Sequence, residues 1–371
     1  MKKLFTAAFI AMLVASCASN SSKECSKKTK TECSKDAKKE CSKDAKKDCD
    51  KAAKTKCTKS AELPAEAIIV TKDNYPQAYT NMRFNAIINK AGGINKFFVM
   101  PTPPSEPEKQ FVVRMNRDTH YSVSVIDFSN DDVFVTVPET DKYVSIQIVD
   151  ENHETQPMIY GSGRHKLSCK TTHAFVIVRS LDDKARKGLK IDSSSAKPFV
   201  LKNWDMESFK AVDKAGNLDF SDGYDQSKAF GNKESGQTPY MNYVGAAGGW
   251  GGAMVEDNIY QTSRYFDNKN VYEVTFKNPR AEYFWSATVY NGDGRMFNDV
   301  ANISSASNPV INEDGTITIR FGATGQPNNI PILEGNTTGK FNVLFRHYGP
   351  GEQVRKGKVG YNPTKMIRKV K

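Results

Sequence analysis

The sequence predicts a mainly β protein with a few helices, organised as two antiparallel, sandwich-like halves after a disordered tether rich in Lys and Cys. Three observations support this fold class. Residues 21–60 form a charged repeat with few apolar side chains. Most of the remaining chain consists of short segments that alternate apolar and polar residues, and helical spacing is confined to two segments. The stretch 61–350 is long enough to bury one large core or two modest ones.

The first 16 residues are expected to be a signal peptide, with Cys17 as a lipidation site. An apolar run from Leu4 to Val14 follows a basic start and is too short to span a membrane. Small residues before Cys17 resemble the lipobox of bacterial lipoproteins, which implies cleavage there and acylation of the thiol. Ala18 replaces the aspartate that retains lipoproteins at the inner membrane, so we expect an outer-membrane location. An ordinary secretory peptide is the alternative.

Residues 17–60 are expected to be a lipidated tether built from a Cys- and Lys-rich repeat with a period of eight. On a helix each step would rotate the thiol by roughly 80°, so no face would collect the cysteines. The segment has no Cys-x-x-Cys pair and no histidine, which disfavours a metal or redox array. In an oxidising compartment the thiols should pair, within a chain or in disulfide-linked multimers. The repeat cysteines are Cys25, Cys33, Cys41, Cys49 and Cys57.

The net charge of +11 is concentrated at the two ends of the chain. Residues 61–350 hold 30 Lys and Arg against 34 Asp and Glu, whereas residues 21–60 and the tail 351–371 are strongly basic. A mildly acidic body is not expected to bind nucleic acid, which requires basic residues clustered on a folded surface. The basic ends instead suit anionic envelope polymers and lipids, such as lipopolysaccharide phosphates or peptidoglycan carboxylates.

Helical spacing marks the start and the middle of the body. Residues 71–91 repeat apolar side chains at steps of three and four, and Gly92 offers a left-handed stop. A second helix is predicted to start near Asp205. Because it separates two β-rich stretches, it places a boundary near residues 200–225. The predicted domains are 61–204 and 205–350, followed by the basic tail 351–371.

Strands are predicted wherever apolar residues alternate or run between turn residues. Asp293-Gly294 and Asp314-Gly315 have the composition of hairpin turns, because glycine supplies the positive φ that such turns require. The predicted strands lie at 111–115, 121–125, 133–137, 144–148, 174–178, 271–276, 283–290, 316–321 and 341–345.

Several ordered motifs carry a resemblance to two known families. Residues 116–122, 149–153 and 160–167 look like domain of unknown function 1254. The resemblance to domain of unknown function 1214 rests on residues 246–252, 284–291, 314–316 and 345–350. Together they cover about residues 70–350, and they imply two β-rich halves without an established reaction. The segment 328–332 departs from the expected pattern, since it lacks an aromatic residue or leucine before its proline.

Polar residues at strand ends are the main candidates for a ligand site. Asp118 and His120 precede a predicted strand, and Asp150 and His153 follow one, so an antiparallel pairing would bring the four together. They are also weak candidates for zinc or manganese ligands, although no His-Glu-x-x-His motif is present. A strand-end network that only holds turns is the structural alternative. The full set of ligand-binding candidates is Asn116, Arg117, Asp118, His120, Gln147, Asp150, His153, Trp250 and Tyr290.

Gln147 belongs to this set because alternation puts it on the strand face opposite Val144, Ile146 and Ile148. A polar side chain on that second face needs partners and therefore indicates a polar cleft.

Hydrolysis by a serine nucleophile is a further hypothesis. Gly161-Ser162-Gly163 lacks the spacing of a nucleophile elbow, but Ser122 or Ser162 could pair with His120, His153 or His165. Cys169, alone before a predicted strand, is expected to be a small buried side chain rather than a nucleophile.

Aromatic residues around a glycine-rich run suggest a flat ligand. Residues 245–252 lack the phosphate-loop motif and are interpreted as a tight loop that positions Trp250, which with Tyr290 could stack on a sugar. Trp285, inside an apolar strand, is expected in the core. Three functions stay open: a lipid-tethered protein that binds a small or glycan-like ligand between its halves, a hydrolase or metal-dependent enzyme, and a structural envelope protein crosslinked through its repeat. The sequence leaves the cofactor unknown.

Overall fold

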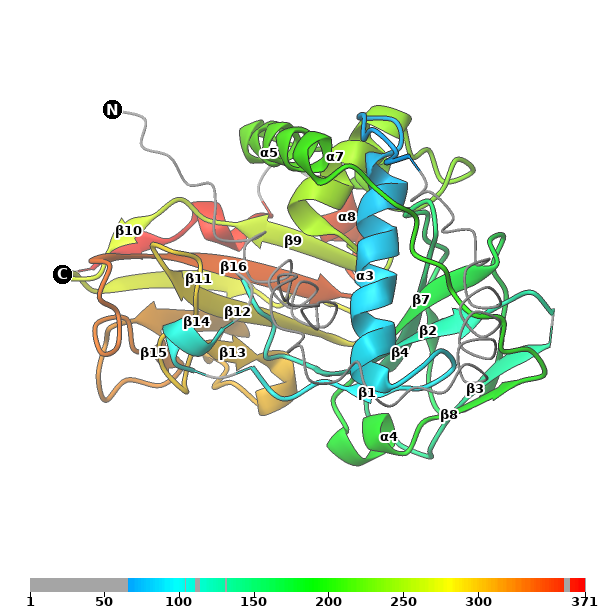
Figure 1. Ribbon diagram of the computed structural model, residues 1–371. Coiled ribbons are helices and arrows are strands. Elements are labelled where there is room, and N and C mark those ends of the chain that lie inside the picture. Colours follow the sequence, from blue (N-terminus) through cyan, green and yellow to red (C-terminus); the bar gives the residue numbers. More distant parts are fainter. Residues whose placement is uncertain (1–65, 104, 111–113, 131, 357–360, 371) are drawn as a thin grey trace, which may run out of the picture. The chain divides into compact units, whose positions relative to one another are not determined.

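Alternating apolar residues fold into antiparallel sheets throughout the described part of the chain, as predicted (Figure 1). The computed structural model describes residues 66–103, 105–110, 114–130, 132–356 and 361–370. The predicted signal peptide, Cys17 and the cysteine repeat lie outside these residues, as does most of the predicted strand 111–115. Residues 69–371 form one compact unit, and the predicted boundary at 204/205 stays a prediction.

The first half packs two sheets face to face. One has five strands in the order β1-β2-β7-β4-β5, and the other has three in the order β6-β3-β8. Val135, Ile146 and Val176 belong to the core between them, because alternate residues of each strand point to the same face. The strands are β1 (Phe98–Val99), β2 (His120–Asp127), β3 (Val133–Val137), β4 (Val144–Asp150), β5 (Ile159–Tyr160), β6 (Gly163–Leu167), β7 (His173–Ser180) and β8 (Lys190–Ser193).

The second half repeats this arrangement. A sheet in the order β10-β16-β12-β13, with β9 also paired to β16, packs on a sheet in the order β15-β14-β11-β17. Trp285 is buried in the core between them, as predicted. All these pairings are antiparallel except that of β14 with β15. The strands are β9 (Asn258–Thr262), β10 (Phe266–Asp267), β11 (Tyr272–Lys277), β12 (Phe284–Asn291), β13 (Asn302–Ser304), β14 (Thr316–Phe321), β15 (Asn329–Ile330), β16 (Lys340–Tyr348) and β17 (Arg368–Lys369).

Both predicted glycine turns adopt the required backbone. Gly294 has φ 75° and Gly315 has φ 76°, values that favour glycine over any residue with a Cβ. A backbone hydrogen bond closes each turn, from Asn291 N to Arg295 O and from Asn312 N to Thr316 O, both at 2.8 Å. The local sequence therefore determined these two turns.

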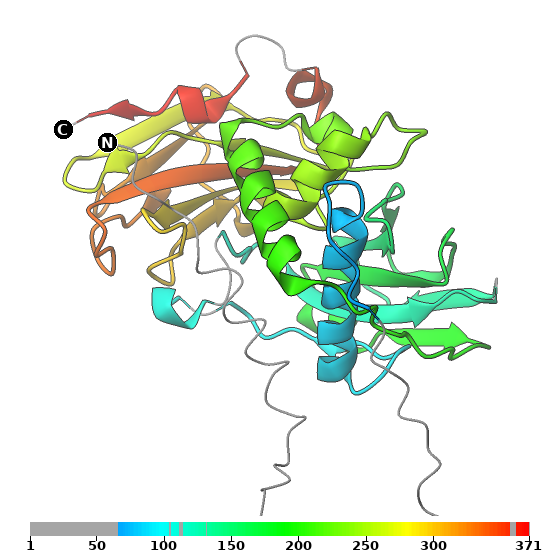
Figure 2. The same cartoon turned by 45° about the horizontal axis from the view of Figure 1, so that its top comes forward.

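Three helices pack together beside the sheets (Figures 1 and 2). The first predicted helix is α3 (Tyr75–Ala91), which ends at Gly92 in the left-handed conformation. The second is α5 (Met206–Asp222), where the Asp205 carboxylate accepts a hydrogen bond from Ser208 N as an N-cap. No helix among the described residues is long and apolar enough to cross a membrane. The short helices are α4 (Asp183–Lys187), α6 (Gln226–Ala229), α8 (Glu352–Arg355), η2 (Pro107–Lys109), η3 (Ser305–Ser307) and η4 (Pro363–Lys365).

The third helix, α7 (Pro239–Gly249), corrects the interpretation of the glycine-rich run as a loop. Its glycines allow close packing, because a Cβ at Gly248 would lie 2.0 Å from the Phe220 ring and one at Gly245 would lie 3.0 Å from Phe230. The helix ends at Trp250, so only residues 250–252 of the run form the expected turn. The glycines of α7 serve close packing between helices, and this composition is the same as that of the tight loop that was predicted.

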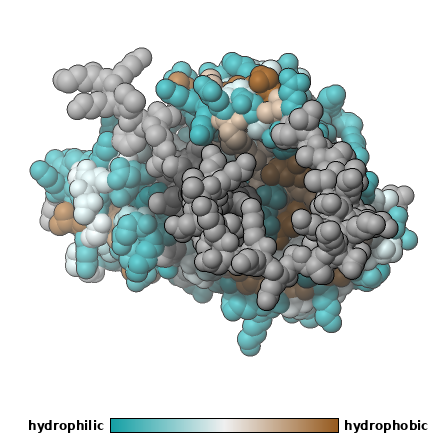
Figure 3. Space-filling view, in the orientation of Figure 1, coloured by the Kyte–Doolittle hydropathy of each residue, from teal (hydrophilic) through white to brown (hydrophobic). Residues whose placement is uncertain are grey.

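The five-stranded sheet of the first half is covered on its second face as well. Val123, Val149 and Phe175 point away from the sandwich core and pack with Phe84 of α3 and with Trp250. Gln147 lies on this second face, as predicted, since Ile146 and Ile148 belong to the opposite core. In the view of Figure 3 the described surface is mainly hydrophilic, and hydrophobic residues gather in few areas.

Candidate functional site

The strand order of the five-stranded sheet separates the two pairs of predicted site residues. His120 at the start of β2 and Val144 at the start of β4 both pair with Ser180, whereas Asp150 at the end of β4 pairs with Ala174. Strands β2 and β4 therefore run parallel to each other, with β7 between them, and their starts share one end of the sheet. The predicted gathering of Asp118, His120, Asp150 and His153 is wrong, because it assumed that the two strands were antiparallel neighbours.

The same topology overturns the four-residue metal site. Asp118 and His120 lie at one end of the sheet, and Asp150 and His153 lie at the other. Within the described ranges no group of three His, Cys, Asp or Glu side chains is placed to hold a metal ion.

His153 is enclosed at the Asp150 end. Its side chain has no exposed surface, its Nδ1 lies 2.7 Å from Asn242 Oδ1, and its Nε2 accepts a hydrogen bond of 2.9 Å from Gly251 N. Since Nε2 accepts, the proton is on Nδ1, and burial lowers the pKa of the ring to about 4. A neutral imidazole thus joins α7 and the turn after it to the end of β4. Both nitrogens are occupied by structural bonds.

Asp150 also bonds locally. One oxygen accepts hydrogen bonds of 2.8 Å from the backbone N–H groups of Asn152 and Glu154, and burial raises the pKa of the carboxyl to about 6. The hollow beside it, which Lys170 and Asn232 also line, has a volume of about 10 Å³. That is room for a single water molecule and excludes a sugar-sized ligand.

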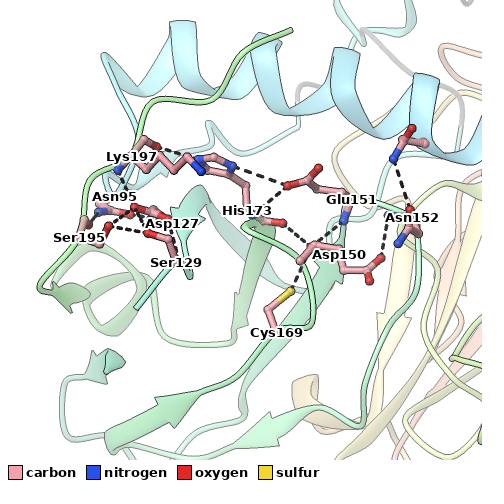
Figure 4. A network of polar contacts seen from close by, with 12 residues as sticks. Asn95, Asp127, Ser129, Asp150, Glu151, Asn152, Cys169, His173, Ser195 and Lys197 are labelled. Carbon is pink, nitrogen blue, oxygen red and sulfur yellow. Dashed lines mark hydrogen bonds and ion pairs between the residues drawn. The ribbon is translucent and has the colours of Figure 1, made fainter. Parts of the chain in front are cut away.

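Further charges at this end of the sheet are paired as well (Figure 4). Glu151 accepts a hydrogen bond from His173 N at 3.0 Å and lies 3.6 Å from the His173 ring. Asp127 accepts hydrogen bonds from Ser129, Ser195 and Lys197 N, and although burial opposes this, these bonds lower the pKa of its carboxyl to about 2. The charged side chains Asp127, Asp150 and Glu151 at this end are therefore held in a structural network.

Cys169, beside this network, packs partly buried against the core of the first half. Burial raises the pKa of its thiol, which disfavours the nucleophilic thiolate.

At the other end of the sheet, Asp118 reaches across to the second half. Its carboxylate is fully buried and accepts hydrogen bonds from Ser286 Oγ at 2.6 Å, Asn302 Nδ2 at 2.8 Å and Tyr348 OH at 3.2 Å. Arg346 lies 3.7 Å from the same carboxylate. Its partners come from β12, β13 and β16, so Asp118 joins the two halves rather than holding a local turn.

Arg346 completes this buried contact. Its guanidinium donates hydrogen bonds to Thr288 Oγ1 at 3.1 Å, Tyr290 OH at 2.8 Å and Arg114 O at 3.2 Å. Tyr290 has no exposed surface and donates to Met115 O at 2.8 Å. Tyr290 is therefore part of the joint between the halves, and its ring is not available for stacking on a ligand as predicted.

The remaining residues of the first motif take different positions. Asn116 donates hydrogen bonds to Tyr121 OH at 2.8 Å and to Tyr348 OH at 2.7 Å, which links the two halves. Arg117 lies 3.5 Å from Asp299, and His120 lies 3.8 Å from Asp183 of α4. Of the predicted candidates, the structure thus brings Asn116, Asp118 and Tyr290 together.

The predicted serine nucleophiles do not pair with histidine in the described structure. Ser122 is buried and donates its hydroxyl hydrogen bond to Arg186 O at 2.8 Å. His165 Nε2 lies 3.0 Å from Gly161 O. Neither arrangement places an imidazole as a base beside a hydroxyl.

Trp250 has a structural contact on each side. Its indole N–H donates a hydrogen bond of 2.9 Å to Thr80 Oγ1 of α3, and its ring meets Phe175 edge to face at 5.0 Å. The side chain fixes α3 over the sheet, and its polar end is already satisfied. The predicted stacking pair of Trp250 and Tyr290 therefore does not form a common surface.

A group of tyrosines that the sequence analysis did not single out lies where the two halves meet. We call Tyr121, Tyr143, Tyr160, Tyr260 and Tyr283 the junction tyrosines, and all five are half-buried. Tyr160 stacks on Tyr283 at 4.6 Å, and Tyr143 lies 5.1 Å from Tyr283. Burial raises the pKa of the Tyr260 hydroxyl, although the side chain keeps accessible surface. Aromatic rings thus gather between the halves, and the hydroxyl groups of Tyr121, Tyr143, Tyr160 and Tyr260 form hydrogen bonds within the protein.

Arg179 of β7 lies among the junction tyrosines. In the sheet it is opposite Tyr121 of β2 and Ser145 of β4, and its guanidinium lies 5.5 Å from the centre of the Tyr121 ring. The side chain is only 7% exposed, yet Nη1 has no hydrogen-bond partner among the described residues. Burial works against its charge, while Tyr121, Tyr260 and Tyr143 outweigh that effect and hold its pKa above the ordinary value.

Gln147 is a diagonal neighbour of Arg179 on the same sheet face, because Gln147 pairs with Ile177. Its amide nitrogen donates hydrogen bonds to Gly251 O at 3.2 Å and Gly252 O at 3.0 Å. Its buried Oε1 has no hydrogen-bond partner among the described residues. One sequence signal could have identified Arg179 as a candidate site residue: it is a charged residue directly after the apolar run 174–178.

Family models match both halves of the chain. The model described as protein of unknown function DUF1254 matches residues 94–196, and that of DUF1214 matches residues 255–352. No curated protein matches. The crystal structure of the VPA0106 protein from Vibrio parahaemolyticus is 17% identical over 81% of this chain and 98% of its own, with a TM-score of 0.58, and it shares the fold. An uncharacterised protein from Burkholderia cenocepacia is 15% identical over 75% and 85%, with a TM-score of 0.44.

Proposed function

This chain belongs to the family of proteins of unknown function that carry DUF1254 and DUF1214 in tandem, and we propose that it is a lipid-anchored envelope protein whose body binds a small, glycan-like ligand at the junction tyrosines. The observation that carries the ligand site is the group of half-buried tyrosines around Arg179. Aromatic rings with convergent polar groups are the usual lining of a small-molecule site.

The junction favours binding over the other candidate positions. At the Asp150 end the polar side chains are occupied by structural bonds and the adjoining hollow is about 10 Å³. At the junction, accessible aromatic surface coexists with buried polar atoms that lack partners, at Arg179 and Gln147. Buried polar groups without partners are costly, so a ligand that supplies the partners would be bound favourably.

The ligand site is tested by removing one accessible ring. Detergent-solubilised full-length protein is screened against a panel of mono- and oligosaccharides by calorimetry, and the best binder is repeated with Tyr283→Ala. We expect this variant to weaken binding by tenfold or more, because it removes two ring contacts at the junction. Tyr240→Ala removes an exposed tyrosine of α7 and is the matched control. Equal affinity in Tyr283→Ala and wild type would refute the proposed site.

The envelope anchor rests on the lipobox-like ending at Cys17 and on the basic segment that follows. Several acyl chains on one residue would hold the protein on a membrane, where a single chain binds only marginally. Cys17→Ser should release the protein into the soluble fraction, and mass spectrometry of the wild type should show acylation. A variant that stays in the membrane fraction, with a wild type that carries no acyl mass, would refute lipidation.

The basic repeat and tail are proposed to contact anionic envelope polymers, and the repeat thiols to form disulfide-linked multimers. Deleting residues 18–60 should remove multimers seen on non-reducing gels. Multimers that persist after the deletion would instead depend on Cys169, which is the free thiol of the described residues.

A further inference from the structure

We infer that the junction ligand is an acidic sugar whose carboxylate or phosphate is bound by Arg179. This inference rests on the proposed ligand site and specifies the chemistry that it recognises. Three features of the described structure support it: a buried cation without an anionic partner, a neighbouring hydrogen-bond acceptor without a donor, and aromatic rings beside both.

The missing partner of Arg179 is an anion. None of the ion pairs formed within the described residues includes Arg179, although the side chain is only 7% exposed. The nearby Asp257 carboxylate attracts Arg179 without forming an ion pair with it, and it accepts a hydrogen bond of 2.6 Å from Tyr160 OH and one of 3.4 Å from Met158 N. A buried guanidinium is most stable when an anion also accepts its hydrogen bonds, so a ligand anion could supply the partner that Nη1 lacks among the described residues.

The buried arginine of the second half shows what a complete partner set looks like in this protein. Arg346 is 4% exposed, lies 3.7 Å from Asp118 and donates to three oxygen atoms of Thr288, Tyr290 and Arg114. Arg179 is buried to a similar degree, but its Nη1 has no hydrogen-bond partner among the described residues and the Tyr121 ring lies 5.5 Å from its guanidinium. A guanidinium binds a carboxylate or phosphate through two parallel hydrogen bonds, which selects these groups over other anions.

The neighbouring Gln147 indicates that the anion also carries hydroxyl groups. Its Oε1 accepts no hydrogen bond from the described residues, while its amide nitrogen is held by Gly251 and Gly252. The orientation of the amide is therefore fixed, with the acceptor directed away from those carbonyls. A ligand O–H would satisfy it, and a sugar ring can also pack against the tyrosine faces.

Three sugars with the same ring separate charge from shape. Calorimetry with detergent-solubilised full-length protein compares glucose, which is neutral, with glucuronate, which carries a carboxylate, and with glucose 6-phosphate. We expect at least one of the acidic sugars to bind tenfold or more tightly than glucose. Glucuronate and glucose 6-phosphate also distinguish the two anionic groups that a guanidinium accepts.

Variants then assign the preference to Arg179. Arg179→Gln should abolish the difference between acidic and neutral sugar, and Arg179→Lys should keep part of it because the positive charge remains. Arg164→Gln is the control, since it removes an equal charge from an exposed arginine paired with Asp192 of β8. Circular dichroism verifies that each variant folds.

The outcomes separate this inference from the proposed site. If glucose binds as tightly as both acidic sugars, or if Arg179→Gln keeps the preference, the inference is wrong while the ligand site stands. If none of the three sugars binds to the wild type, the inference is overturned as well, and the saccharide panel with Tyr283→Ala decides the fate of the site.

Discussion

The two ends of the five-stranded sheet carry similar polar residues but are built differently. At the Asp150 end, the Asp150 carboxylate closes a turn within four residues, and Asp127 and His153 bond to segments 68 to 98 residues away. At the Asp118 end the partners lie far away in the sequence, such as Ser286, which is 168 residues from Asp118. At this second end a buried arginine, Arg179, has a guanidinium nitrogen without a hydrogen-bond partner among the described residues.

The difference shows that residue type did not determine role. Asp118 and Asp150 are both buried carboxylates at strand ends, yet the first joins two halves of the fold and the second closes a turn. The ligand site is indicated by the contrast between Arg346, which lies beside the Asp118 carboxylate, and Arg179, which forms no ion pair within the described residues.

The largest effect is expected at the paired arginine. Arg346→Met should lower the free energy of unfolding by about 3–5 kcal/mol, because it leaves the Asp118 carboxylate buried without its cation. Urea denaturation followed by circular dichroism measures the change. Arg320→Met, at a half-buried arginine of β14, is the control and should be close to wild type. A loss below about 1 kcal/mol for Arg346→Met would show that the halves are held together without this contact.

At the opposite end, Asp150→Asn should stabilise the protein in a pH-dependent manner. The folded-state pKa of about 6 lies above the ordinary value of 3.8, so the folded protein binds more protons than the unfolded chain between pH 4 and 6. Wild-type stability due to Asp150 therefore falls as the pH rises through this window. Asn has no charge to bury and keeps an oxygen that accepts from Asn152 and Glu154.

The measurement is the difference in unfolding free energy between Asp150→Asn and wild type at pH 4 and pH 7. From pH 4 to pH 7 this difference should shift in favour of the variant by about 2 kcal/mol, because most of the titration between the unfolded pKa of 3.8 and the folded pKa of about 6 lies in this range. The comparison cancels the opposite pH dependence of His153, whose lowered pKa makes stability fall as the pH drops below 6.5. A constant difference across this range would contradict the assignment of Asp150 as a buried, locally bonded carboxyl.

Between the two ends, Trp250→Phe should cost about 1–2 kcal/mol of stability, because it leaves Thr80 Oγ1 buried without its donor. The double variant with Thr80→Val removes both partners and should recover part of the loss. Sugar affinity should stay at the wild-type level, since the ring packs against α3 rather than among the junction tyrosines. A tenfold loss of affinity with unchanged stability would return Trp250 to the ligand site.

The smallest effect is expected outside both ends. Deleting residues 18–60 should leave the thermal unfolding transition nearly unchanged, because this segment has too few apolar residues to contribute to a core. Differential scanning calorimetry of full-length and shortened protein tests this. A marked loss of cooperativity would mean that the repeat packs on the body.

Sequence patterns predicted which residues form strands better than they predicted which strands lie side by side. Alternation in residues 144–148 identified β4 and the outward position of Gln147, and the two Asp-Gly turns followed from glycine chemistry. Alternation carries no information about which strand lies beside which, so β2 and β4 were treated as antiparallel neighbours. That single missing fact produced the wrong four-residue site.

The contacts between the two halves could not be predicted from the sequence for a related reason. The partners of Asp118 are set by how the two halves pack, and no local spacing encodes a contact over 168 residues. Helix α7 was missed because glycines that serve close packing have the same composition as a loop. Arg179 directly follows an apolar run, where a charge is conspicuous, but only the structure shows that its Nη1 has no hydrogen-bond partner in the described part of the chain.

The central claim is that Arg179 binds a ligand and does not stabilise the fold. One substitution tests this claim most directly. The free energy of unfolding of Arg179→Met is measured by urea denaturation in a zwitterionic buffer without added salt or sugar. We predict that it equals or exceeds the wild-type value, because the substitution removes a buried charge that has no anionic partner. A loss of about 3 kcal/mol or more, as expected for Arg346→Met, would contradict the account and make Arg179 a structural residue.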